Sequence, residues 1–139
     1  MATKYTFKIY PVGRSREIYR IIEISGNSTL DDLCDAILEA FDFTHEHLYE
    51  FCLNNKPYCD YCMQYLTEDD MTETNVKIDK LNLDKGQNFL FHYDFGDDWM
   101  FTVHVNKIEE VSGRIKTTQV GEKGKLEQYP DWDDEECEF

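Results

Sequence analysis

Three carboxylates lie within five positions of one another in a short aromatic and acidic block, Tyr93-Asp94-Phe95-Gly96-Asp97-Asp98-Trp99. Oxygen-rich clusters at a turn can hold Mg²⁺, Mn²⁺ or Ca²⁺, so Asp94, Asp97 and Asp98 are candidate metal or ligand contacts. Asp and Gly are also the residues that a tight turn requires, through side-chain hydrogen bonds and permissive backbone angles. We favour the turn and keep metal binding as the alternative.

Aromatic side chains accompany these carboxylates. Tyr93, Phe95 and Trp99, together with His47, could line a groove for a ligand. Aromatic residues that flank a hairpin more often pack into the core, where their area contributes most to stability. The groove is therefore the less favoured of two interpretations.

The cysteines raise the question of zinc. Cys59 and Cys62 have the two-residue gap that allows two thiolates to bind one ion. A structural site needs four ligands, and His45, His47 and Cys52 would have to supply the others. Because no second pair with matching spacing is present, we predict no zinc and no other cofactor. The five cysteines are an odd number, and no secretory signal precedes them, so reduced thiols are expected.

The acidic block lies between two alternating apolar patterns, residues 89–93 and 101–105, which predict a hairpin. Earlier alternation predicts neighbouring strands over 5–10 and 18–24 and a third strand over 48–53. Residues 54–75 show little periodicity and are expected to form a loop or lid, with a brief strand at 76–78 and a last strand over 114–120. The predicted fold is α+β, with one mixed or antiparallel sheet in the order β-β-α-β and then further strands.

One helix is predicted to pack on a face of that sheet. Residues 30–41 carry apolar side chains at helical spacing, and the preceding Ser28 and Thr29 are candidate N-caps. The opposite side carries Asp31, Asp32, Asp35 and Glu39. Cys34 falls on the apolar stripe, where a cysteine usually behaves as a small hydrophobic residue.

At the acidic block the sequence resembles the root-inducing plasmid ORF-3-like family, whose members are also described as insertion-element passenger proteins. Ile18-Tyr19-Arg20 is similar to the family's Ile-Trp-Arg, and Leu30, Leu33 and the run 47–51 follow in the family's order. The resemblance covers roughly residues 3–106 and implies an α+β fold and an association with mobile elements, but no reaction. The family's Cys-Pro-Pro-Glu-Asp region is absent, and Cys59 and Cys62 do not belong to its pattern.

Length and charge narrow the range of functions. The chain has 139 residues, which predicts one domain over 1–130 followed by an acidic tail at 131–139. Its net charge is −15, and the resulting electric field repels phosphate backbones and anionic lipid. We therefore expect no nucleic-acid or membrane partner, and a cytoplasmic location, since neither a signal peptide nor a spanning segment is evident.

These observations together favour a small binding or interaction module over an enzyme, with a protein or a small molecule as partner. The alternative is a metal-dependent hydrolase of phosphate esters that uses Asp94, Asp97 and Asp98. Against this alternative, no general base has a clear place and no basic residue near the hairpin could neutralise a phosphate.

Overall fold

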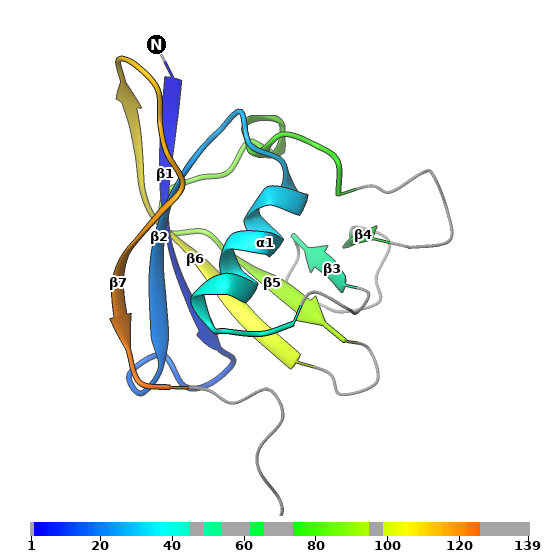
Figure 1. Cartoon of the computed structure of the whole chain (residues 1–139). Helices are drawn as coiled ribbons and strands as arrows, with labels where there is room; N and C mark the ends of the chain where they lie inside the picture. Colours follow the sequence, from blue (N-terminus) through cyan, green and yellow to red (C-terminus); the bar gives the residue numbers. More distant parts are fainter. Residues whose placement is uncertain (1, 45–48, 54–61, 66–73, 95–98, 126–139) are drawn as a thin grey trace, which may run out of the picture.

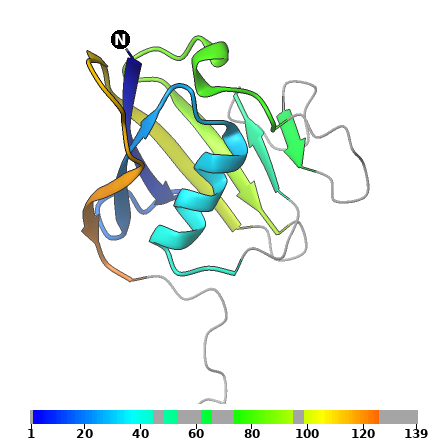
Figure 2. The ribbon, with the colours of Figure 1, turned by 45° about the horizontal axis from the view of Figure 1, so that its top comes forward.

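An antiparallel seven-stranded sheet forms the body of the protein, with one helix lying across one of its faces (Figures 1 and 2). The computed structural model describes residues 2–44, 49–53, 62–65, 74–94 and 99–125, with 62–65 described by their backbone alone. The strands follow the order β4-β3-β5-β6-β1-β2-β7, and every neighbouring pair is antiparallel. Their bounds are β1 Ala2–Pro11, β2 Tyr19–Ser25, β3 Tyr49–Cys52, β4 Cys62–Tyr65, β5 Asn88–Tyr93, β6 Trp99–Val111 and β7 Thr118–Lys123. The predicted fold class is confirmed.

The helix α1 spans Leu30–Ala40 and begins with a capping box. The Thr29 side chain accepts a hydrogen bond from the Asp32 backbone N–H, and the Asp32 side chain accepts one from the Thr29 backbone N–H. Two N–H groups that the helix itself cannot satisfy are thereby satisfied. The buried residues are those of the predicted stripe: Leu30, Leu33, Cys34, Ile37 and Leu38.

The core lies between α1 and the sheet face that it covers. Alternate residues of the central strands point toward the helix, and fully buried phenylalanines dominate this layer. Across β3 and β5 the Phe51 and Phe91 ring centroids are 4.8 Å apart, and Phe41, at the end of α1, lies with its ring centroid 5.0 Å from that of Phe101 on β6. A second, smaller cluster on the other face contains Cys52 and Leu90.

Both edges of the sheet differ from the prediction. The strand β4 lies within the stretch that was predicted to be a loop, and β7 begins four residues later than the predicted last strand. Residues 76–78 form no strand: the 3₁₀ turn η1 spans Ile78–Leu81, and Lys77 makes only an isolated bridge to Thr29. These segments are short and polar, so their pairing depends on the finished sheet more than on local pattern.

No helix in the described part of the chain is both long enough and apolar enough to cross a lipid bilayer.

Candidate functional site

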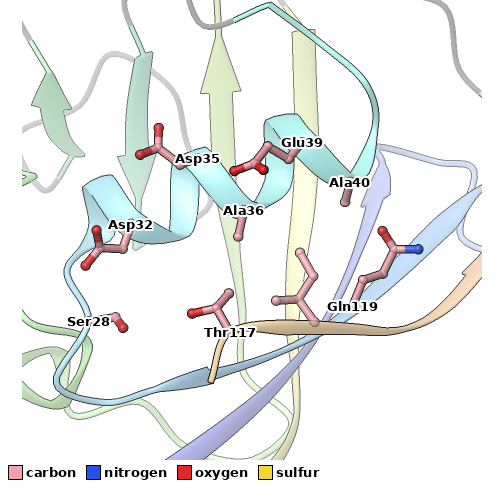
Figure 3. A pocket seen from close by; sticks show the side chains of 9 residues that line it. Ser28, Asp32, Asp35, Ala36, Glu39, Ala40, Thr117 and Gln119 are labelled. Carbon is pink, nitrogen blue, oxygen red and sulfur yellow. The ribbon is translucent and has the colours of Figure 1, made fainter. Parts of the chain in front are cut away.

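A groove of ≈ 560 Å³ runs between α1 and the edge strand β7 (Figure 3). The helix contributes one wall with exposed carboxylates, β7 contributes the other with polar side chains, and the buried side chain of Ile22 lies between them. The small side chains of Ala36 and Ala40 leave space on the helix side. The lining residues are Ile22, Ser28, Asp32, Asp35, Ala36, Glu39, Ala40, Thr117 and Gln119.

Arg20 fixes one end of this groove. Its Nε donates to the carbonyl oxygen of Ala40 at 2.9 Å, and its Nη1 donates to the carbonyl oxygen of Lys123 at 3.0 Å. The guanidinium also lies 4.8 Å from the centre of the Phe41 ring. A buried cation at the C-terminal end of a helix is stabilised by the carbonyls that the helix leaves unsatisfied. Arg20 therefore joins the end of α1 to β7.

A polar cluster positions the other end of the helix. Asp31 Oδ1 accepts hydrogen bonds from the hydroxyls of Tyr49 and Thr74, each at 2.5 Å. Burial is the largest cause that raises the pKa of Tyr49 well above its usual value, and the nearby Cys34 and Asp31 raise it further. The hydroxyl therefore stays protonated and donates. Burial, followed by the charge of Asp35, likewise raises the pKa of the Cys34 thiol. These contacts hold α1 against β3.

The groove is electrostatically one-sided. Asp32, Asp35 and Glu39 are exposed along α1, while Thr117, just before β7, and Gln119 on β7 offer hydroxyl and amide groups. Among the described residues that line the groove, none is basic. Three carboxylates at successive turns of one helix create a negative potential over the groove, which favours a cationic occupant.

The structure describes one of the three hairpin carboxylates. Asp94 is buried and has a positive φ of 61°, a conformation that Asp tolerates better than most residues. This geometry agrees with a turn-forming role for Asp94. Asp97 and Asp98 lie outside the described residues, so the metal-site interpretation stays a prediction. Among the side chains that the structure describes, no three ligating groups are placed to hold a metal ion.

The predicted aromatic groove is described in part. Tyr93 is fully buried in the core, and its hydroxyl donates to the carbonyl oxygen of Thr44. Trp99 is half-buried and packs against Phe43, with ring centroids 5.0 Å apart. Both rings therefore contribute to the core. His47 and Phe95 lie outside the described residues.

The cysteine pair that was considered for zinc is also described in part. Cys59 lies outside the described residues, and Cys62 is the first residue of β4, with Cys52 of β3 as its partner in the ladder. The register therefore brings Cys52, a residue considered only as a supplementary ligand, next to one member of the pair.

Sequence reasoning missed the groove itself. The acidic residues of α1 were placed opposite its apolar stripe, and three of them, Asp32, Asp35 and Glu39, are exposed there, whereas Asp31 is half-buried. What the sequence could not indicate is that β7 returns to lie beside β2 and faces those carboxylates across a gap. The available signal was the repeat of acids at positions 32, 35 and 39 with alanines at 36 and 40.

Comparisons with known proteins agree with this fold. A crystal structure of a protein of unknown function from Methanosarcina mazei Go1, MM3350, is similar with a TM-score of 0.70 and 27% sequence identity over 88% of this chain and 70% of that one. No curated protein matches the chain. The family model described as plasmid pRiA4b ORF-3-like protein matches residues 3–131, a longer stretch than the motifs alone suggested. The chain therefore belongs to the plasmid pRiA4b ORF-3-like family.

Proposed function

We propose that this protein is a small binding module whose groove between α1 and β7 accepts an extended, positively charged segment of another protein. The observation that carries the proposal is the row of exposed carboxylates at Asp32, Asp35 and Glu39 along a groove without a basic lining residue among those described. A Lys or Arg side chain entering this groove would meet carboxylate oxygens on one wall and polar groups on the other.

The shape of the groove favours an extended occupant over a compact one. The strand β7 is the last in the sheet order, and no other strand in the described part of the chain pairs with its outer edge, where a further strand could be added. A bulge leaves Val120 without a counterpart on β2, and this side chain is 51% exposed. Addition of a strand would supply backbone hydrogen bonds, and the α1 carboxylates would select the charge of its side chains.

The other functional expectations fit the same proposal. The proposal includes a cytoplasmic location and an association with mobile elements. The negative field of the protein favours a protein partner from such an element over the element's DNA. A hydrolase that uses the hairpin carboxylates has no such support from the described residues, because only Asp94 of that cluster is described.

The test is binding of a labelled peptide in which Lys alternates with Val, measured by fluorescence anisotropy against wild type and the double variant Asp35→Lys/Glu39→Lys. We expect the double variant to bind at least about 10-fold more weakly, because two attractive charges become repulsive. Asp32 is left unchanged because it also caps the helix. Binding to wild type should weaken as salt is added.

The matched control is the pair of substitutions Asp84→Lys and Lys85→Glu, made singly. Asp84 is exposed in the turn before β5 and does not line the groove, so Asp84→Lys makes elsewhere the charge change of one of the two substitutions in the double variant. It should leave peptide affinity within about two-fold of wild type. If net charge alone governs binding, Asp84→Lys should lose half as much affinity, on a logarithmic scale, as the double variant, and that result would refute the groove.

A further inference from the structure

The sheet face that α1 does not cover carries a second group of buried polar side chains. Glu50 of β3 and His92 of β5 are direct partners in the ladder, with Glu50 Oε2 2.7 Å from His92 Nδ1, and both are fully buried. Cys52 lies two residues from Glu50 on the same face and is also fully buried. Because strand side chains alternate, these residues point away from the phenylalanine core.

The strand register places a second cysteine beside this group. Cys52 of β3 is the direct partner of Cys62 of β4. Direct partners in an antiparallel pair lie on the same sheet face, with Cα atoms about 4.5 or 5.5 Å apart. Disulfides form when the Cα atoms are about 4.4–6.8 Å apart, so either kind of pairing satisfies this requirement without movement of the backbone.

We propose that Cys52 and Cys62 are a redox pair that forms a reversible disulfide between β3 and the edge strand β4 by exchange with a small-molecule disulfide such as oxidised glutathione. The crosslink would close the segment 53–61 and fasten one edge of the sheet to its neighbour. This site is separate from the α1–β7 groove, which lies at the opposite edge in the strand order.

The exchange proceeds in two steps. The Cys62 thiolate, on the outermost strand, attacks one sulfur of oxidised glutathione, and one glutathione thiolate leaves as the original disulfide breaks. The Cys52 thiolate then attacks the Cys62 sulfur of this mixed disulfide and displaces the second glutathione. The two protein thiols lose two protons and two electrons in all, and one oxidised glutathione is reduced to two thiols.

The fold also explains why Cys34 should not compete with Cys62 for a disulfide with Cys52. Cys34 lies on α1 within the main core, whereas Cys52 belongs to the cluster on the other face, so the sheet separates the two sulfurs. Cys34 and Cys52 are equally buried, but Cys52 has Cys62 as its direct partner in the ladder, so the strand register and not burial distinguishes these two thiols. Cys34 is therefore a control within the same molecule.

The test is to equilibrate the full-length protein with mixtures of reduced and oxidised glutathione, to block the remaining thiols and to map the peptides by mass spectrometry without reduction. We expect one dominant linked peptide that joins Cys52 to Cys62, removed by dithiothreitol, while Cys34 is recovered blocked only after unfolding. Cys62→Ser should abolish the link and Cys59→Ser should preserve it. Because Cys62 lies on an edge strand, Cys62→Ser should keep the circular dichroism spectrum of wild type.

Three results would overturn the proposal. The first is a dominant link from Cys59 to either partner. The second is mixed glutathione disulfides that never resolve into a protein disulfide. The third is one zinc ion per chain by elemental analysis with Cys52 and Cys62 protected from blocking, since thiolates held by a metal would not exchange.

Discussion

Individual tyrosine hydroxyls connect parts of this chain that are distant in sequence. The hydroxyl of Tyr5 on β1 donates to Asp79 in η1, that of Tyr49 on β3 donates to Asp31 on α1, and that of Tyr93 on β5 donates to the Thr44 carbonyl. Alternation along the strands predicted that the rings of Tyr5 and Tyr93 face the core. The partners of the hydroxyls lie 74 and 49 residues away, and no local pattern indicates them.

The Tyr5 contact gives a prediction for alkaline pH. Burial, followed by the hydrogen bond to Asp79, raises the pKa of Tyr5 from 10.0 to about 12. The folded state therefore holds this proton more tightly than the unfolded state does, so its contribution to stability is complete below about pH 10 and disappears as the pH rises to about 12. In urea titrations across this range, the free energy of unfolding of wild type should fall more steeply than that of Tyr5→Phe. Parallel curves for the two proteins would contradict the prediction.

For individual residues, the sequence predicted burial correctly in the main core between α1 and the sheet. It did not predict burial on the other face of the sheet. Cys34 was predicted on the buried stripe of the helix, and this is confirmed. Glu50 and His92 alternate with phenylalanines, so the pattern placed them on the polar side of their strands. In the structure both are fully buried there, paired with each other. Alternation indicates which face a residue occupies but not what covers that face.

At the scale of elements, the helix was the most predictable part of the chain because its signals are local. The N-cap, the acidic first turn and the apolar stripe all lie within fourteen residues of sequence and describe one helix. The central strands were also predicted, since their aromatic and β-branched residues alternate clearly. The strand order and the edge strand β4 were not predictable, and the bounds of β7 were predicted too early, because these features depend on pairings between distant segments with little apolar pattern of their own.

The cap of α1 gives a prediction at this scale. Thr29→Ala removes the acceptor for the Asp32 backbone N–H, and we expect the free energy of unfolding to fall by about 0.5–2 kcal/mol. Thr29→Ser keeps the hydroxyl and should lose less than half as much. Urea denaturation of the three proteins, followed by circular dichroism, measures both differences. A Ser variant as unstable as the Ala variant would instead assign the role of Thr29 to packing of its methyl group.

At the scale of the whole molecule, two basic side chains hold parts of the fold together. Arg20 is buried between α1 and β7, and Lys4 lies between Glu23 and Glu109 at 3.4 and 3.6 Å. The groove, in contrast, exposes Asp32, Asp35 and Glu39. The net charge of −15 was known from the sequence, but its arrangement around one groove required the fold. The proposed kind of partner rests on the charge, and the proposed binding place rests on the topology.

The same charge distribution predicts that the protein does not bind duplex DNA at physiological salt. Binding without sequence preference requires clustered Lys and Arg to displace counterions from phosphates, and the chain has 14 basic residues against 29 acidic ones. Anisotropy titration of a labelled duplex in about 0.15 M salt should therefore show no saturation up to micromolar protein. The variant Asp35→Lys/Glu39→Lys should behave in the same way, because its net charge is still strongly negative, although its peptide binding should be weaker. Sub-micromolar duplex binding by wild type that weakens as salt is added would mean that a local basic surface outweighs the overall field, and the proposed preference for a cationic protein segment would then have to be abandoned.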